Sequence, residues 1–265
     1  MSQAVKAKWD AEAYAKHSSA QAKWAGELLS KLKLKGNECV IDIGCGNGRN
    51  THEIASRLPS GSVVGIDSSD SMISLAKRSW QRHNLSFQTM DAANINLDRQ
   101  FDVAFSNAVL HWIENHQAVL TGLKQHLNPN ARILLQMGGY GNARDIVEVF
   151  ESIIASCTWS VYFHDFQFPY YFYKHGDYEK WLPECGYQAL RTDLIFKDMI
   201  HESVSGLKGW LITTWFPYTD RVPEDRRDIF LDQIIQTYLA GRPLDQYGRT
   251  HVHMVRLEVE AKVSG

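Results

Sequence analysis

Short apolar runs alternate with helical patterns through the first half of the 265-residue chain. An N-terminal segment at about 9–34 has helical spacing in two pieces. The strand-like runs that follow are residues 39–43, 62–67, 85–91, 101–107 and 132–137. The helical segments between them lie at about 50–58, 69–80 and 115–127, and Ser68 or Ser69 suits the N-cap of the second. Strands that alternate with helices at this spacing predict βαβ units around a parallel sheet that is buried on both faces.

The rhythm changes after Met137. A helical pattern at 143–156 precedes residues 159–173, of which nine of fifteen are aromatic. The remaining elements are a helix at 177–187 that closes near Gly186, a strand at 189–199, an insertion of about fifty residues and an alternating strand at 251–263. Seven strands in this order predict an α/β fold with a doubly wound, mostly parallel sheet.

The interruptions of the pattern predict a single domain, 1–265, with a mostly helical cap and no linker. Its parts are an N-terminal helical lid (1–36), a ligand-binding core (37–137), cap insertions (138–188 and 203–250) and the last two strands (189–200 and 251–263).

Composition narrows the classes of function. The formal net charge is −2, which gives no electrostatic case for binding nucleic acid or an anionic membrane surface. The four cysteines have no CxxC spacing, and no run of about 18 apolar residues is present. The N-terminal sequence MSQAVKAKWD lacks the apolar region of a signal peptide. We therefore expect a cytoplasmic protein.

A glycine-rich turn follows the first strand, in the sequence VIDIGCGNGRN. Its glycines are Gly44, Gly46 and Gly48, and Arg49 stands where the dinucleotide fingerprint G-x-G-x-x-G requires its third glycine. The lysine and Ser or Thr of a P-loop are also absent from the sequence of this turn. The turn would let the backbone approach a ligand, but its register fits neither a dinucleotide nor a nucleoside triphosphate. A tight strand–helix turn without a ligand is the alternative.

Acidic residues end or closely follow three successive strands beside this turn. They are Asp42, Asp67 and Asp91, the last followed by Ala92. One aspartate at a strand end is often only a helix cap, but three around a glycine turn favour a ligand. They would repel a triphosphate, and they suit a cofactor with a ribose, an adenine and a cationic centre.

Three segments resemble the class I S-adenosylmethionine (SAM)-dependent methyltransferases: DIGCGNG, VVGIDSSDSMI and FDVAFSNAVLHW. The leader WDAEAYxxHxxxQ, from Trp9 to Gln21, resembles the lid of the trans-aconitate, juvenile hormone acid and malonyl-ACP O-methyltransferase group. The resemblance extends from about Trp9 to Ala261. The chain departs from that group at Asn130-Ala131, where a Gly-Gly pair is usual.

The resemblance implies a role for each cofactor-site residue. Gly44 to Gly48 would wrap the methionyl and ribose portions of SAM, with Cys45 as a small turn residue and Asp42 near the ammonium group. Asp67 would bind the ribose. Met72 and Ser68 would pack on the adenine, although Met72 also suits simple core packing. The adenine edge would meet Asp91 and Ala92, and the methionyl amine would meet Asn107.

Methyl transfer from a sulfonium requires alignment of the nucleophile, and a base only if the acceptor is not already ionised. His111, just beyond the fourth strand, would hydrogen-bond a substrate carboxylate or act as a base, or would simply pack under the lid. On the lid, Tyr14 and Gln21 are further catalytic candidates. The substrate-binding candidates are His17, Gln21, His111, Trp112 and Tyr140.

The cap offers less specific signals. Its aromatic run, with Trp210, Trp215 and Phe216, suits either a pocket for an apolar acid or the packing of the cap. A tricarboxylate would require convergent arginines, for which the candidates are Arg144, Arg191, Arg242 and Arg249. His251-x-His253 places two imidazoles on one strand face without an evident third ligand, so we expect no metal site. The sequence RVPEDRRD (221–228) reads as a solvated helix start.

The sequence thus predicts a SAM-dependent methyltransferase that acts on a small molecule, at a carboxylate oxygen, with S-adenosylhomocysteine (SAH) as the product. Malonyl-ACP, or the O, N or C atom of a hydrophobic or aromatic metabolite, is an alternative acceptor. A SAM-binding regulatory protein without turnover is an alternative of another class, and Arg49 disfavours NAD. The sequence does not distinguish a monomer from a homodimer.

Overall fold

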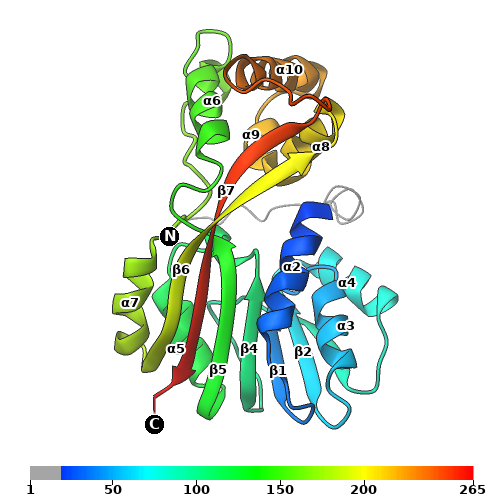
Figure 1. Cartoon of the computed structure of the whole chain (residues 1–265), viewed down its shortest axis with the longest axis vertical. Helices are drawn as coiled ribbons and strands as arrows, with labels where there is room; N and C mark the ends of the chain where they lie inside the picture. The colour runs from blue at the N-terminus through cyan, green and yellow to red at the C-terminus, as the bar shows by residue number, and fades with distance from the viewer. Residues whose placement is uncertain (1–18, 265) are drawn as a thin grey trace. The chain divides into compact units, whose positions relative to one another are not determined.

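The computed structural model describes residues 19–264 of the chain (Figure 1). The chain divides into two compact units. The first, here called the sheet unit, contains Ala22–Tyr140, Tyr170–Ile195 and Val255–Gly265. The second, the helical unit, includes Gly141–Pro169 and Phe196–Met254. The two inserted helical segments expected as a cap fall largely in the helical unit, and the single-domain interpretation stays a prediction.

The sheet has seven strands in the order β3-β2-β1-β4-β5-β7-β6, as Figure 1 shows. Neighbouring strands from β3 to β5 are parallel, whereas β7 is antiparallel to β5. This confirms the predicted doubly wound, mostly parallel fold. The strands are β1 (Cys39–Ile43), β2 (Ser62–Asp67), β3 (Leu85–Thr89), β4 (Phe101–Asn107), β5 (Leu127–Gly138), β6 (Tyr187–His201) and β7 (Thr250–Val263).

Helices cover both faces of this sheet because successive strand side chains point to opposite faces. Val40 packs with Leu28 of α2 and Ile54 of α3 on one face. Its neighbour Ile41 packs with Leu120 of α5 on the other face. The helices of the sheet unit are α2 (Ser19–Lys31), α3 (Arg49–Ser56), α4 (Asp70–Ser79), η1 (Leu110–Trp112), α5 (His116–Lys124) and α7 (His175–Glu184).

The start of β5 differs from its prediction. The strand begins at Leu127 rather than at residue 132, and its pairing with β4 shifts register between Phe101 and Val103. Within the added segment Asn130 has a φ of 62°, a conformation that asparagine adopts more readily than most residues. This backbone conformation explains why asparagine can occupy a position where glycine is usual in the group that the sequence resembles.

The helical unit has its own aromatic interior. The ring centroids of Phe150 and Tyr218 are 4.3 Å apart, and those of Trp159 and Phe230 are 4.9 Å apart. The first part of the aromatic run therefore packs inside this unit. Its helices are α6 (Arg144–Ile154), η2 (Ser160–Tyr162), α8 (Val204–Thr214), α9 (Phe216–Thr219) and α10 (Glu224–Gly241).

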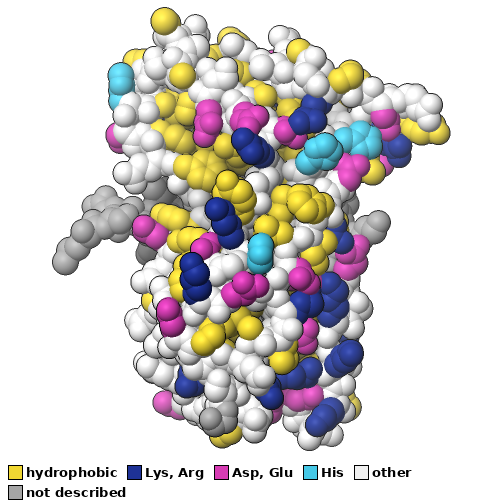
Figure 2. Space-filling model, turned by 60° about the vertical axis from the view of Figure 1, so that its left-hand side comes forward, with side chains coloured by type: hydrophobic (Ala, Val, Ile, Leu, Met, Phe, Trp, Pro, Cys, Tyr) yellow, Lys and Arg dark blue, Asp and Glu magenta, His cyan; other side chains and the backbone are white. Residues whose placement is uncertain are grey.

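The start of α10 agrees with the solvated helix start predicted at 221–228, since Pro223 immediately precedes the helix. On the face drawn in Figure 2, basic and acidic side chains are interspersed, as the near-zero net charge leads one to expect. Within residues 19–264, no helix is both long and apolar enough to cross a membrane.

Candidate active site

The glycine turn after β1 is held against the end of β2. The backbone N–H groups of Gly44 and Cys45 both donate to the carbonyl oxygen of Ile66, at 2.7 and 2.9 Å. Gly44 has a φ of 69°, and a Cβ at this position would lie 2.2 Å from a methyl group of Val109. Only glycine satisfies both the backbone conformation and the space that Val109 leaves.

Gly46, at the tip of the turn, is different because its α-carbon faces open space. Its φ is 52°, and an added Cβ would meet no atom within 4 Å. Its N–H donates to Asp67 Oδ2 at 2.9 Å, and the N–H of Ser69 donates to Asp67 Oδ1 at the same distance. Asp67 thus joins the glycine turn to the N-terminus of α4, where Ser69 is the N-cap.

Asp42 lies beneath the turn on the face of the sheet that α3 covers. Only 2% of the residue is exposed, and Thr51 donates its hydroxyl to Asp42 Oδ2 at 2.6 Å. Burial raises the pKa of Asp42 to about 7, the charge of Asp67 adds to this rise, and the Thr51 hydrogen bond opposes it. Burial also raises the pKa of Asp67. Two carboxylates that resist ionisation favour a cationic ligand beside them.

Asn107 ends β4 at the same edge of the sheet. Its side-chain Oδ1 is buried and accepts no hydrogen bond from any described residue. The next residue, Ala108, has a φ of 59°, a strained conformation for a residue other than glycine. A buried acceptor without a donor, at the carboxyl edge of the sheet, is an arrangement that an ammonium group would complete.

The other cofactor-site candidates lie around the same strand ends. Cys45, Met72 and Ala92 are buried, whereas Ser68 and Asp91 are exposed. Burial raises the pKa of the Cys45 thiol, so Cys45 is no nucleophile. Asp91 Oδ1 accepts from the N–H of Ala93 at 2.9 Å, so this carboxylate also shapes its own turn. These residues fit SAM by the acceptor groups they present and the space above Gly46.

His111 stands in η1, directly after β4. The residue is 9% exposed, and the backbone N–H of Gly138 donates to its Nδ1 at 3.2 Å. Because a backbone N–H can only donate, Nδ1 carries no proton and the neutral ring carries its proton on Nε2. Burial lowers the pKa of His111 well below its ordinary value, and the charges of Arg256 and His116 lower it further. Nε2 has no hydrogen-bond partner among the described residues.

Aromatic rings surround His111. The centroids of Trp112, Tyr170 and Phe172 lie 5.7, 6.1 and 6.0 Å from its own. Tyr170 and Phe172 are nearly parallel, with 7° between their planes. The end of the aromatic run therefore belongs to the surroundings of His111. The sequence of residues 159–173 does not indicate that its first part packs inside the helical unit while its end surrounds His111.

His116 connects η1 to α7 through two hydrogen bonds. Its Nε2 bonds the carbonyl oxygen of Leu110 at 2.7 Å, and its Nδ1 bonds the hydroxyl of Tyr178 at 2.8 Å. Burial lowers the pKa of His116 to about 4, so this ring is neutral too. His116 was not among the candidates predicted from the sequence, although it follows His111 by only five residues.

The remaining substrate-site candidates are only partly described. Tyr14 and His17 lie outside the described residues, and only the backbone of Gln21 is described, within α2. Tyr140 is exposed, with the ammonium group of Lys174 4.5 Å from its ring centroid. These roles stay predictions.

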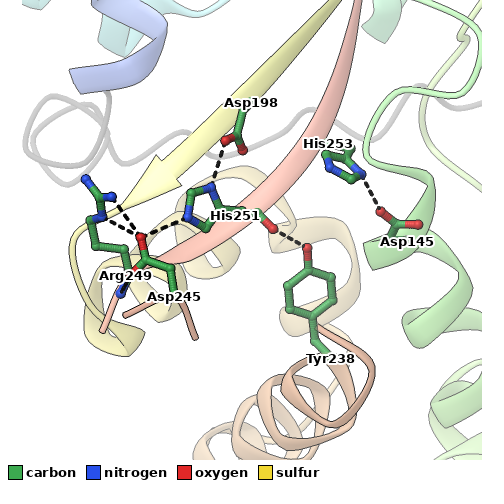
Figure 3. A network of polar contacts seen from close by, with 7 residues as sticks. All are labelled: Asp145, Asp198, Tyr238, Asp245, Arg249, His251 and His253. Atoms are coloured by element: carbon green, nitrogen blue, oxygen red, sulfur yellow. Dashed lines mark hydrogen bonds and ion pairs between the residues drawn. The ribbon is translucent and has the colours of Figure 1, made fainter. Parts of the chain in front are cut away.

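Each of the four candidate arginines forms an ion pair with a carboxylate of the chain. They contact separate carboxylates, in the pairs Arg144–Glu148, Arg191–Glu258, Arg242–Asp145 and Arg249–Asp245. The two candidate metal-binding histidines also contact carboxylates, as Figure 3 shows for His251 with Asp198 and for His253 with Asp145. Within residues 19–264, no group of three or more His, Cys, Asp or Glu side chains is placed to hold a metal ion.

Known proteins resemble this chain in sequence and in fold. A methyltransferase-domain family model matches residues 34–165. A trans-aconitate 2-methyltransferase of Methylobacterium radiotolerans is 31% identical over 265 residues, which cover 97% of this chain and 98% of the relative. A malonyl-[acyl-carrier protein] O-methyltransferase of Bacillus cereus is 30% identical over 145 residues, or 53% and 54% of the two chains.

Among solved structures, the magnesium protoporphyrin IX methyltransferase of Synechocystis PCC 6803 with bound SAH has a TM-score of 0.54 at 16% identity. The match covers 94% of this chain and 84% of that one, and it supports the fold alone. A relative at 31% identity over nearly the whole chain, together with the sheet order 3-2-1-4-5-7-6, shows that the chain belongs to the class I SAM-dependent methyltransferases.

Proposed function

We propose that this methyltransferase transfers the methyl group of SAM to a carboxylate oxygen of a small organic acid. The observation that carries this proposal is the hydrogen bond from the Gly138 N–H to His111 Nδ1. His111 follows the end of β4 and bonds the end of β5, the edge where open parallel sheets bind their ligands.

The hydrogen bond supports a role as hydrogen-bond donor over a role as base for His111. A base must offer a lone pair, but the lone pair of Nδ1 faces Gly138 and Nε2 already carries the proton. The lowered pKa of His111 also opposes the imidazolium that a base would become. His111 therefore acts as a neutral hydrogen-bond donor through Nε2.

A neutral hydrogen-bond donor suits a methyl acceptor that is already ionised and therefore nucleophilic. A carboxylic acid is ionised at pH 7, whereas a phenol or an alcohol must lose its proton during the transfer. The chain then has to bind the carboxylate, orient one oxygen and exclude water, and the aromatic rings around His111 are suited to the last task.

SAM, when bound, supplies a methyl group on a positively charged sulfur that an in-line nucleophile can displace. The residues that would hold it are Asp42, Asp67, Asn107 and the Gly44–Gly48 turn. Asp42 and Asp67 would face its positive charges, and Asn107 Oδ1 would accept from its ammonium group. Gly46 would leave room for it.

The relatives support the same class of acceptor. The 31% identical relative is a trans-aconitate methyltransferase, and the identity extends over both units of this chain. Trans-aconitate itself is therefore the first acid to test. Malonyl-ACP is the second candidate, because a relative with that name matches about half of the chain.

The test is turnover with SAM labelled in its methyl group. A panel of carboxylic acids, including trans-aconitate, is compared with alcohols and phenols of matched size and with malonyl-ACP. We expect label in base-labile methyl esters of one or more free acids. Label in methyl ethers would contradict the proposal, and SAH binding without any methylated product would favour the regulatory alternative.

Two variants of His111 separate a donor from a base. His111→Gln retains an N–H donor, and His111→Leu does not. A donor role predicts that His111→Gln keeps most of the activity, while His111→Leu loses roughly 10- to 100-fold, the effect of one hydrogen bond to a charged group. Equal loss in both variants would indicate a base and would contradict the proposed role.

A further inference from the structure

Trp80 lies at the end of α4 and contacts the glycine turn that follows β1. Its indole N–H donates to the carbonyl oxygen of Asn47, the residue between Gly46 and Gly48, at 2.9 Å. No backbone N–H of the described residues donates to this carbonyl oxygen. The hydrogen bond therefore joins the turn to a side chain that lies 33 positions further along the chain.

The peptide group between Asn47 and Gly48 is held at both of its polar atoms. The Gly48 N–H donates to the carbonyl oxygen of Cys45 at 3.0 Å and closes a β-turn, while the Asn47 carbonyl accepts from Trp80. Gly48 has a φ of 79°, and glycine has few steric limits of its own. The orientation of this peptide group therefore depends on its hydrogen bonds, of which the bond from Trp80 is one.

The indole ring of Trp80 is itself supported by α3 and α4. His52 of α3 stacks on it, with 4.4 Å between the ring centroids and 26° between the planes. Arg82 Nε donates to His52 Nε2 at 3.3 Å, which fixes the histidine ring in turn. The backbone N–H of Trp80 donates to the carbonyl oxygen of Ala76 at 2.9 Å. The indole N–H is thus presented to the turn from a supported position.

The turn is tightly packed at Gly48 and open at Gly46. A Cβ at Gly48 would lie 2.6 Å from a ring atom of Phe87 and 2.9 Å from the Cβ of Ala76. Trp80 packs against the cluster to which Phe87 and Ala76 belong. A Cβ at Gly46 would meet no atom within 4 Å. Trp80 therefore belongs to the packed surroundings of the turn, and the space assigned to SAM lies at Gly46.

We propose that Trp80 is a positioning residue for SAM, whose indole N–H holds the Asn47 carbonyl and so keeps the glycine turn in the conformation that binds the cofactor. This inference rests on the cofactor site of the proposed function and not on the identity of the acceptor. A turn that is ordered before binding loses less conformational freedom when the ligand arrives, so the affinity is higher. Without the hydrogen bond the Asn47–Gly48 peptide group would take up other orientations, and only a fraction of the molecules would be ready to bind.

The test is Trp80→Phe, which keeps an aromatic ring against His52 and removes the N–H donor. Calorimetry should show that the dissociation constant for SAH rises about three- to tenfold, the effect of one neutral hydrogen bond. The KM for SAM should rise by a similar factor and kcat should stay within about twofold, because a bound cofactor restores the turn. Unchanged SAH affinity in a folded Trp80→Phe protein overturns the inference.

Hydrogen exchange tests the same proposal without turnover. In the ligand-free proteins, the backbone amides of residues 44–49 should exchange several-fold faster in Trp80→Phe than in the wild type. With saturating SAH the two proteins should exchange alike in this segment. Equal exchange in the ligand-free proteins would show that the hydrogen bond does not order the turn, and the inference fails.

Trp181→Phe is the matched control. Trp181 is another half-buried tryptophan of the sheet unit beside a histidine, since its ring centroid lies 6.1 Å from that of His116. Its other ring neighbours are Tyr173 and Tyr178 rather than residues of the turn. We expect Trp181→Phe to leave the SAH affinity and the exchange of residues 44–49 unchanged. Equal weakening of SAH binding in both variants would indicate a general effect of losing a tryptophan and would contradict the proposed role.

A second variant separates the hydrogen bond from the stacking of the rings. His52→Leu removes the stacking partner and leaves the indole N–H of Trp80 in place. We expect it to weaken SAH binding less than Trp80→Phe does. A larger loss in His52→Leu would assign the effect to the packing of α3 and would overturn the role of the hydrogen bond.

The outcomes also distinguish this inference from the proposed function. If the wild-type protein binds neither SAM nor SAH, the proposed function fails, and the inference about Trp80 fails with it. If the wild type binds SAH and Trp80→Phe binds it equally well, only the inference about Trp80 fails.

Discussion

Replacing Gly44 or Gly46 in the turn after β1 by alanine should have different effects, because the added methyl group meets different surroundings. Gly44→Ala places a Cβ 2.2 Å from Val109, so we expect it to disturb the fold. Gly46→Ala meets no protein atom, and its cost to stability is only the left-handed backbone, about 1–2 kcal/mol. The new methyl would instead occupy the space assigned to SAM. We therefore expect Gly46→Ala to fold and to bind SAH at least tenfold more weakly.

Calorimetry with SAH, together with thermal unfolding of both variants, checks this prediction. Unchanged SAH affinity in a folded Gly46→Ala protein would show that the space above Gly46 does not hold the cofactor.

Asp42 should make the stability of the ligand-free protein depend on pH. Its folded pKa of about 7 lies above the ordinary value of 3.8, so the folded state binds more protons than the unfolded chain between these two values. Stability must then fall as pH rises from about 4 to about 7, by at most about 1.4 kcal/mol per pH unit. Asp42→Asn keeps an acceptor for Thr51 and should be free of this loss.

Urea denaturation of both proteins at several pH values measures the difference. The raised pKa of Asp67 adds a fall of the same sign in both proteins, so only the difference between them reports on Asp42. Parallel pH profiles would contradict the assignment.

Some features of the candidate site could be predicted from the sequence pattern, and others could not. Asp67 and Asn107 could be proposed as site residues because a polar residue at the end of a buried strand is visible in the sequence pattern. The proton position on His111 depends on a backbone N–H from β5, which no side-chain pattern records.

At the scale of the elements, His251 at the start of β7 joins β6 to the connection between α10 and β7. His251 Nδ1 lies 2.7 Å from Asp198 on β6, and its Nε2 lies 3.2 Å from Asp245 in the connection (Figure 3). Both nitrogens can donate only when the ring is protonated, and the two carboxylates raise the pKa of His251 above its ordinary 6.5. The stabilisation is fully present below about pH 6.5 and is lost as pH rises through the higher folded pKa.

We therefore expect backbone amides of residues 242–249 to exchange faster, by several-fold, at pH 8.5 than at pH 6 after correction for intrinsic rates. Hydrogen-exchange mass spectrometry of the wild type and of His251→Gln measures this, and the variant should show no such change. Arg249 also contacts Asp245 and limits the size of the effect in both proteins. His253→Gln, which removes an exposed contact with Asp145, is the control and should behave like the wild type.

Strands were predicted well where they are buried on both faces. The bounds of β1, β2 and β4 agree with the predicted 39–43, 62–67 and 101–107, because unbroken apolar runs have sharp ends. The start of β5 was missed because Pro129 and Asn130 are typical of a turn, while here they belong to an irregular strand. Helix ends differ by one to three residues at most of the predicted boundaries within residues 19–264, where capping rather than pattern decides.

For the molecule as a whole, cofactor binding should be visible as stability. A ligand at about 100 times its dissociation constant adds roughly 2.7 kcal/mol to the free energy of unfolding if it binds only the folded state. We expect this increase with SAM, SAH and sinefungin and none with NAD. Thermal unfolding at matched concentrations measures it, and stabilisation by NAD alone would contradict the cofactor assignment.

The path of the chain between the two units has a consequence for protein engineering. The chain leaves the sheet unit after residue 140 and returns at 170, and it leaves again after 195 and returns at 255. Each pair of ends is already close, since the Tyr140 N–H donates to the Tyr173 carbonyl oxygen at 2.9 Å and Leu194 lies against Gly139, which bonds Val255. Two short linkers would therefore excise the two inserted segments of the helical unit without spanning a gap. The shortened protein would retain His111 and the glycine turn, and would show how much acid recognition a minimal methyltransferase keeps.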